Sequence, residues 1–323
     1  MKPNLKIIIL TLVTITIGCF ATPLSAGSRD GAGESPKTHL SRVFTNLENT
    51  IAGYVEDKDA RIGVAVIANH HDTFCINGNR EFPMMSVFKF PLSLAVAQWV
   101  DSRGGSFDDS ISITSAMLRD NTYSPMFQKY GKTDIILPIS ELVDWSLVHS
   151  DNNACDILLD LIGGTAVVDS LLRQLGVNGE ITIGATEAEM DADHYLIYLN
   201  RATPLAMAAL FERFQRAMCH QSSSFKAIES MLERCQTGMD RLPAPLASNA
   251  IIGHKTGTGF TTPDGRLTAL NDCGYVRLPD GTTYTIAVFV ADSAYDGADT
   301  AKIIADISRL VLSAIQNNLV SNP

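Results

Sequence analysis

The order of strand-like and helix-like segments constrains the fold of this chain most strongly. Arg61–Ala68 alternates apolar side chains as a strand does, and three more segments rich in Ile, Val and Tyr follow residue 237. These are Ala250–Gly253, Cys273–Arg277 and Thr283–Ala291, with a turn predicted at Pro279-Asp280-Gly281. Strands near both ends of the chain indicate a single sheet built from both ends.

The segments between these strands carry apolar residues at the three-to-four spacing of helices. They are Leu92–Val100, Ser140–His149, Asn152–Ile162, Ala166–Leu175, Leu205–Met218 and Phe225–Arg234. Val43–Tyr54 and Ala298–Ile315 add a helix at each end. Because helices and strands are segregated, we predict an α+β, multi-domain fold. An α/β sheet domain would comprise residues 27–84 and 237–323, and an all-α domain residues 85–236.

Bulk composition limits the classes of partner. The chain has 323 residues, of which 46% are hydrophobic and 19% charged, as is ordinary for a soluble enzyme. Its formal charge of −10 is not offset by any basic block. This balance argues against nucleic acid or an anionic membrane as a partner.

The first 26 residues have the pattern of a secretion signal. Two lysines precede the apolar run Ile7–Phe20, and Leu24-Ser25-Ala26 offers small residues for cleavage. The run is shorter than the roughly 20 residues of a membrane-spanning helix. We expect residues 1–26 to be a signal peptide and the protein to be secreted across the inner membrane into the periplasm. Lipid attachment at Cys19 is the alternative.

Removal of that signal would leave an odd number of cysteines. They are Cys75, Cys155, Cys219, Cys235 and Cys273. In an oxidising compartment at least one thiol would then be free, and no C-x-x-C motif indicates redox or zinc chemistry. Cys219 and Cys235 flank a predicted helix and could pair, although burial as small apolar residues is the preferred interpretation.

The first chemical motif is Ser86-Val87-Phe88-Lys89. Residues three apart on a helix share a face, and Pro91 is tolerated only near a helix start, so we expect Ser86 at a helix N-terminus. There a backbone N–H could stabilise an oxyanion, and Lys89 could be the base that a serine nucleophile needs. S-x-x-K alone is unspecific, since Ser223-Ser224-Phe225-Lys226 repeats it; we interpret that copy as a helix N-cap.

Two tripeptides make the pattern specific. Ser150-Asp151-Asn152 interrupts two predicted helices, where it could also be a simple cap. Lys255-Thr256-Gly257 follows a predicted strand and continues as Thr258-Gly259. Its lysine offers a fixed charge for a carboxylate, and its glycine lets a substrate backbone approach the strand edge. A given tripeptide arises by chance about once in several thousand positions, so coincidence is a minor option.

With S-x-x-K, S-D-N and K-T-G in this order, the chain resembles the class A serine β-lactamases over nearly all of its mature length. It looks similar to their cephalosporin-hydrolysing, extended-spectrum-like branch. The resemblance implies an antiparallel sheet flanked by helices, with the active site between the sheet and the all-α domain.

The resemblance also assigns roles to individual residues. Ser86 would attack the lactam carbonyl, Ser150 would relay a proton to the leaving nitrogen, and the backbone N–H groups of Ser86 and Thr258 would form the oxyanion hole. The implied catalytic residues are Ser86, Lys89, Ser150, Glu187 and Lys255. The implied substrate-binding residues are Asn152, Thr256, Thr258, Tyr123 and Arg241. Asp151 would be structural.

An acidic loop distinguishes hydrolysis from permanent acylation. Glu187 lies where the family carries the acid that activates water, with Glu189 as the lesser candidate. An isolated glutamate would more often be a solvated surface residue. The loop departs from the commonest pattern, because Ala188 replaces a proline and Asp191 replaces an asparagine that helps to hold the water. Whether this glutamate or the lysine is the acylation base in the family is disputed.

Three further positions complete the predicted site. Tyr123 matches an aromatic residue that walls the pocket, although a core tyrosine beside a turn is nearly as good an interpretation. The arginine that the family usually places on the strand after K-T-G is missing, because that place falls near Asn271-Asp272. Arg241 lies where some members carry a substitute. His254 could tune the field of Lys255, although a lone strand histidine is more often structural.

We therefore predict a monomeric serine hydrolase that opens small-molecule β-lactams, both penicillins and cephalosporins, without a cofactor. Neither H-x-H nor H-E-x-x-H occurs, so no metal site is predicted. A penicillin-binding D,D-peptidase is the nearest alternative, because it shares the three motifs but does not need Glu187. A β-lactam sensor domain that remains acylated is the more distant one.

Overall fold

The computed structural model describes residues 36–68, 70, 72–174, 176 and 180–320, with side chains between residues 45 and 317 of these ranges. The predicted signal peptide and its alternative at Cys19 lie outside the described residues. The described residues belong to one compact unit, which begins at Pro36.

A five-stranded antiparallel sheet joins the two ends of the chain in the order β2-β1-β10-β9-β8. Its strands are β1 (Arg61–Ala68), β2 (Asp72–Ile76), β8 (Ile251–Thr258), β9 (Leu267–Arg277) and β10 (Thr283–Ser293). Val64 pairs with Val288 across β1 and β10, and Lys255 pairs with Cys273 across β8 and β9. The predicted antiparallel sheet is confirmed. The K-T-G motif, expected after a strand ending at Gly253, lies inside β8 instead.

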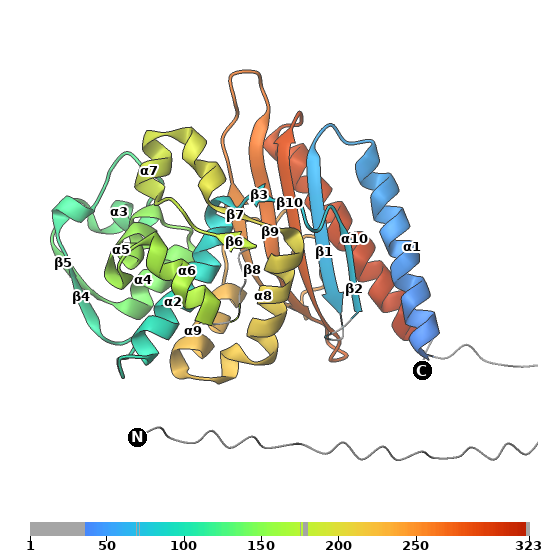
Figure 1. The fold of residues 1–323 in the computed structure, drawn as a ribbon, viewed down its shortest axis with the longest axis horizontal. Coiled ribbons are helices and arrows are strands. Elements are labelled where there is room, and N and C mark those ends of the chain that lie inside the picture. The colour runs from blue at the N-terminus through green and yellow to red at the C-terminus, as the bar shows by residue number, and fades with distance from the viewer. Residues whose placement is uncertain (1–35, 69, 71, 175, 177–179, 321–323) are drawn as a thin grey trace, which may run out of the picture. The chain divides into compact units, whose positions relative to one another are not determined.

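Helices cover both faces of this sheet (Figure 1). Successive residues of a strand point to opposite faces, so Val64 and Val66 enter one core and Ala65 and Ile67 the other. The first core is closed by α1 (Pro36–Glu56) and α10 (Gly297–Val320), and the second is covered by α8 (Pro204–Arg216). A sheet buried on both faces requires continuous apolar strands, as β1 and β10 have.

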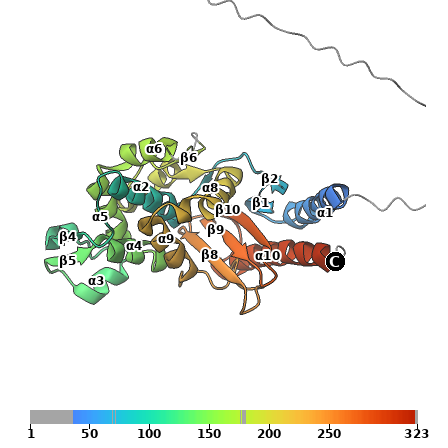
Figure 2. The same cartoon turned by 90° about the horizontal axis from the view of Figure 1, so that it is seen from below.

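A helical region lies beyond α8 (Figures 1 and 2). Its helices are α2 (Lys89–Asp101), α4 (Ile139–Val148), α5 (Asn152–Ile162), α6 (Thr165–Gln174) and α9 (Ser223–Glu233). Helix α2 is buried around nearly its whole circumference, as expected for the central helix of such a cluster. Each of these helices was predicted within three residues of its observed bounds, and α5 without error.

Short elements were not indicated by the apolar periodicity. The strands are β3 (Phe82–Pro83), β4 (Ser110–Ile113), β5 (Ile135–Pro138), β6 (Ile181–Thr182) and β7 (Arg201–Ala202). The short helices are α3 (Pro125–Tyr130) and α7 (Glu187–Ala192), with 3₁₀ turns η1 (Met85–Phe88), η2 (Ser115–Met117), η3 (His194–Leu199) and η4 (Met218–His220). Segments of two to six residues are too short to show a period.

Two smaller expectations can be compared with the coordinates. All five described cysteines are free, so the possible Cys219–Cys235 pair does not form. The second S-x-x-K sequence opens α9, as the N-cap interpretation required. The cap itself is one residue earlier, at Ser222, whose hydroxyl accepts from the Phe225 N–H at 3.4 Å.

Candidate active site

Ser86 lies in the turn η1, immediately before α2 begins at Lys89. Met85 holds a positive φ of 47°, a left-handed conformation that costs free energy in a residue with a side chain. The strand β8 approaches this turn so closely that a β-carbon at Gly257 would collide with the Met84 carbonyl. Asn271 adds a brace, because its amide donates to the carbonyls of Pro83 (2.9 Å) and Met84 (3.0 Å).

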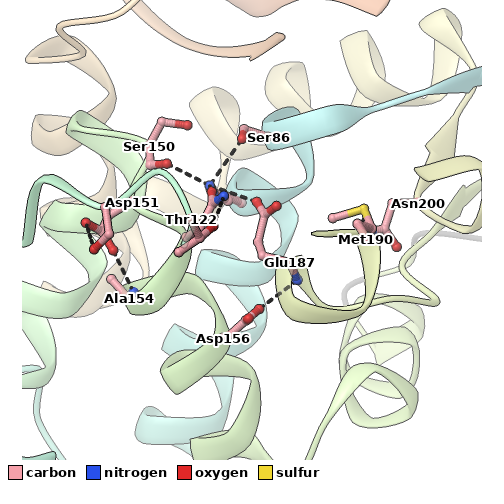
Figure 3. A network of polar contacts seen from close by, with 12 residues as sticks. Ser86, Thr122, Ser150, Asp151, Ala154, Asp156, Glu187, Met190 and Asn200 are labelled. Carbon is pink, nitrogen blue, oxygen red and sulfur yellow. Dashed lines mark hydrogen bonds and ion pairs between the residues drawn. The ribbon is translucent and has the colours of Figure 1, made fainter. Parts of the chain in front are cut away.

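The Lys89 ammonium is the centre of the site. Figure 3 shows Ser86, Ser150 and Glu187 close together around it. The ammonium is fully buried and donates to Ser86 Oγ (3.1 Å), Ser150 O (2.8 Å) and Asn152 Oδ1 (2.7 Å), with Glu187 Oε1 at 2.9 Å. Burial alone would lower the pKa of Lys89, but the Glu187 carboxylate and other acidic neighbours raise it above its ordinary value. In this arrangement the lysine is therefore charged and paired.

Helix α7 places Glu187 toward the amine and turns Glu189 away. Thr186 and Glu189 form a reciprocal capping box, in which the Glu189 carboxylate accepts from the Thr186 N–H at 2.8 Å. Glu189 is exposed, whereas Glu187 is only 7% exposed. The coordinates thus bring Glu187, and not Glu189, to the serine.

Asp156 on α5 anchors this loop, and sequence reasoning missed it. Its two carboxylate oxygens accept from the backbone N–H groups of Glu187 (2.8 Å) and Ala188 (2.9 Å). Burial raises the pKa of Asp156 to about 6 against the opposing effect of these hydrogen bonds. Arg119 pairs with Asp156 (2.9 Å) and with Asp191 (2.7 Å). Asp191, which replaces the usual asparagine, is thus held by an arginine at the rim of the cavity.

The three residues of the S-D-N motif make different contacts. Ser150 has a positive φ of 60°, and its hydroxyl accepts from Lys255 Nζ at 3.0 Å. Asp151 is buried and caps α5 through the Ala154 N–H (2.9 Å), which agrees with its expected structural role. Asn152 accepts from Lys89 and donates to Thr122 Oγ1 at 2.9 Å.

Strand β8 forms a second wall of the site, and Ser150 and Asn152 belong to the first. Lys255 is fully buried, and burial lowers its pKa to about 8. The Thr256 hydroxyl lies 2.5 Å from that of Thr237, a residue that sequence reasoning missed. Arg241 donates to Thr258 Oγ1 (2.7 Å) and to the carbonyls of Gly257 (3.2 Å) and Asn271 (2.9 Å). The expected substitute arginine therefore lines the cavity beside Thr258, while Asn271 serves as a brace.

These walls enclose a cavity of about 620 Å³. Eight of the ten predicted site residues line it: Ser86, Tyr123, Ser150, Asn152, Glu187, Arg241, Thr256 and Thr258. Lys89 and Lys255 lie directly behind them. Two lining residues, His194 of η3 and Phe260 beyond β8, are in ring contact with 4.5 Å between centroids. Volume and polar lining suit a small organic molecule.

A serine hydroxyl beside a buried lysine that is paired with a buried carboxylate is an arrangement typical of serine hydrolases. A sequence model described as the β-lactamase enzyme family matches residues 46–315, and the chain belongs to that family. Similar proteins of known structure include class A β-lactamases, which identifies the branch of the family.

Relatives of known sequence cover most of the chain. A β-lactamase from Bacteroides uniformis is 35% identical over 278 residues, which is 85% of this chain and 93% of that protein. The β-lactamase VEB-1 from Pseudomonas aeruginosa is 38% identical over 274 residues, covering 82% of this chain and 89% of the relative.

Solved structures agree with these relatives. The extended-spectrum β-lactamase TLA-1 superposes with a TM-score of 0.82 at 34% identity, covering 84% of this chain and 99% of that one. A class A β-lactamase from Bacteroides cellulosilyticus DSM 14838 gives 0.81 at 36%, covering 85% and 99%. This protein is a class A serine β-lactamase, and it hydrolyses β-lactams, which confers antibiotic resistance.

No described helix is long and apolar enough to cross a membrane. Within the same residues, no three His, Cys, Asp or Glu side chains are grouped as metal ligands would be.

Proposed function

We propose that this enzyme hydrolyses penicillins and cephalosporins through an acyl-enzyme on Ser86, with Glu187 as the base that releases it. The contact that carries this proposal runs from Ser86 Oγ through the Lys89 amine (3.1 Å) to Glu187 Oε1 (2.9 Å). A carboxylate 7% exposed and two contacts from the serine can orient and deprotonate a water, whereas a solvated surface acid cannot.

Acylation would begin with loss of the Ser86 proton. Because its acidic neighbours raise the pKa of Lys89, the resting lysine is charged and cannot itself accept that proton. Glu187 is then the acceptor, with a water or the Lys89 amine as the relay. Backbone N–H groups of Ser86 and Thr258 would stabilise the oxyanion, a contribution of about 3 kcal/mol per donor in other hydrolases.

The leaving nitrogen would receive its proton from Ser150. The Lys255 ammonium donates to this hydroxyl at 3.0 Å, which leaves the hydroxyl hydrogen free to point elsewhere. Since the pKa of Lys255 is lowered to about 8, Lys255 can return a proton to Ser150 at little cost.

Two sets of residues would bind different parts of the substrate. Asn152 and Tyr123 would contact the acyl side chain, and Lys255, Thr256 and Thr258 would bind the carboxylate. Arg241 would add positive charge beside Thr258, at 2.7 Å from its hydroxyl. A carboxylate is bound most strongly by such charge-assisted donors.

A burst experiment tests the role of Glu187. In Glu187→Gln the carboxylate that raises the pKa of Lys89 is gone, so the lysine can accept the Ser86 proton and acylation continues. Mixing this variant with a chromogenic cephalosporin should give one equivalent of product and then turnover about 1,000-fold slower than wild type. Glu189→Gln is the matched control, because glutamine preserves the capping box and turnover should be unchanged. Burst-only kinetics in the wild-type enzyme would instead identify a D,D-peptidase or a sensor, and undiminished turnover in Glu187→Gln would refute the assignment.

Secretion into the periplasm is proposed from the sequence of residues 1–26, and we expect the secreted enzyme to be a monomer. Mass spectrometry of the exported protein should find an N-terminus at Gly27. A lipidated N-terminus at Cys19 would establish membrane anchoring instead.

A further inference from the structure

A buried cluster of three ionisable side chains lies behind the carboxylate-binding wall. Cys235 precedes the wall segment that holds Thr237 and Arg241, His254 lies on β8, and Asp272 lies on β9. The three are 8%, 2% and 0% exposed, and none of them lines the cavity. The mechanism above uses none of them.

Hydrogen bonds connect this cluster to the cavity. Asp272 Oδ1 lies 2.8 Å from His254 Nδ1, and the imidazole is close enough to Cys235 to change the pKa of its thiol. The Cys235 sulfur lies 3.4 Å from Thr237 Oγ1, which lies 2.5 Å from Thr256 Oγ1 on the cavity surface. Hydrogen bonds therefore connect the Cys235 thiol, next to the His254–Asp272 pair, with a hydroxyl that lines the cavity.

A second branch reaches the arginine. Asp272 Oδ2 accepts from the backbone N–H of Leu242 at 3.2 Å, and Leu242 directly follows Arg241. The same carboxylate thus fixes the backbone next to Arg241 and the imidazole next to Cys235.

The charges in the cluster are coupled. Burial disfavours a charged His254, but Asp272 and Cys235 raise its pKa to about 10, so it is an imidazolium at neutral pH. Burial likewise disfavours a thiolate, but His254 lowers the pKa of Cys235 to about 7, with Lys255 acting in the same direction. The thiolate form of Cys235 is therefore accessible near neutral pH.

Lys255 responds to that anion. Burial lowers its pKa, and so do Lys89 from α2 and Arg241 from the segment before β8. Cys235 and Asp272 oppose them and keep the pKa at about 8. The cluster therefore holds the lysine in its charged form against burial and two other cations.

We propose that Cys235, His254 and Asp272 act together as a positioning unit for the substrate carboxylate, orienting the Thr256 hydroxyl through Thr237 and balancing the charge of Lys255. This inference rests on the proposed carboxylate-binding role of Lys255 and Thr256. Cys235 touches no substrate itself and acts through these residues.

The test compares a cephalosporin that carries its carboxylate with the methyl ester of the same compound. The readout is the ratio of kcat/KM for the acid to kcat/KM for the ester, measured on one preparation of each variant. This ratio does not depend on the fraction of folded enzyme, so a poorly folding variant remains informative. Cys219→Ala is the matched control, since Cys219 is also a buried free thiol, lies in η4 and hydrogen bonds to the Gln215 carbonyl (3.2 Å).

In Cys235→Ala the acid-to-ester ratio should fall about tenfold, through a higher KM for the acid with kcat nearly unchanged. The alkaline limb of kcat/KM for the acid should also move to lower pH, because Lys255 loses an anionic neighbour. Cys235→Ser should restore part of the ratio, since its hydroxyl can bond to Thr237, but should leave the limb displaced. Cys219→Ala should change neither.

Two results would overturn the inference. An unchanged ratio and an unmoved limb in Cys235→Ala would show that the cluster is only a satisfied polar core. An equal loss on acid and ester would show a structural role alone. If the wild-type enzyme itself did not discriminate between acid and ester, the carboxylate-binding role of Lys255 would fail, which is a different outcome from either.

Discussion

Two lysines lie behind the same cavity, one in the helical region and one in the sheet, and both are fully buried. Lys89 has Glu187 at 2.9 Å, and its pKa is raised. Lys255 donates only to neutral oxygens, of Ser150 and of Thr256, and its pKa is lowered to about 8. The same burial thus gives opposite shifts, and a contacting carboxylate decides the sign.

The difference assigns the two lysines different tasks. Lys89 belongs to a pair that is complete within the protein, which suits a group that relays protons. Lys255 makes no ion pair with a described side chain, so an incoming carboxylate can supply the missing negative charge. Four experiments test this difference between the two lysines and the contacts that cause it.

The largest effect is expected from Lys89→Met. Loss of the relay should lower kcat/KM by about 1,000-fold or more. Leaving Glu187 buried without its partner should lower the free energy of unfolding by about 3 kcal/mol, measured by urea denaturation. Lys89→Met combined with Glu187→Gln should recover part of that stability; a double variant no more stable than the single one would contradict the pairing.

Lys255→Met should separate activity from stability. KM for a β-lactam carboxylate should rise about 100-fold, because the charge-assisted contact is lost. The free energy of unfolding should nevertheless increase by about 1 kcal/mol, since an unpaired buried charge is removed. Destabilisation as large as that of Lys89→Met would mean that the two lysines are equivalent.

The pH profile of kcat/KM should show the lowered pKa of Lys255. Lys255 is charged below about pH 8 and neutral above it, so binding of an anionic substrate weakens as pH rises through that value. Activity should fall up to tenfold per pH unit on this limb. The limb should be weaker for the methyl ester, for which Lys255 only returns a proton to Ser150, and a limb of equal size for both compounds would contradict the carboxylate-binding role.

The smallest effect is expected from Asp156→Asn. One of its two backbone acceptors is lost, which loosens the start of α7 and should slow deacylation about fivefold. Acylation should change little, as single-turnover mixing can measure. Asp160→Asn, one turn further along α5 and exposed, is the matched control.

Sequence patterns predicted the large elements and the residues that line the cavity. Strand β1 and helix α5 were predicted without error, because their apolar periods extend over eight and eleven residues. The S-x-x-K, S-D-N and K-T-G motifs mark one site because their residue types have few other uses in that order. Patterns of this kind carry no distances.

The features of the site that the sequence did not predict depend on contacts between segments that are far apart in the chain. Asn271 lies near the place where the family usually has an arginine. It serves instead as a brace, because its amide donates to the carbonyls of Pro83 and Met84 just before Ser86. Asp156 becomes an anchor only because the chain returns to it 31 residues later. The opposite pKa shifts of the two lysines follow from the position of Glu187, which no local pattern specifies.

Met85, which directly precedes Ser86, and Ser150, whose carbonyl accepts from Lys89, are both in left-handed conformations. Each such residue costs on the order of 1–3 kcal/mol and persists only because the rest of the fold enforces it. A natural domain has a margin of only about 5–15 kcal/mol, so much of it is already committed to this geometry. Adaptation to new antibiotics by loosening the loops is therefore limited by the two apolar cores, and compensating substitutions in those cores should precede changes in drug spectrum.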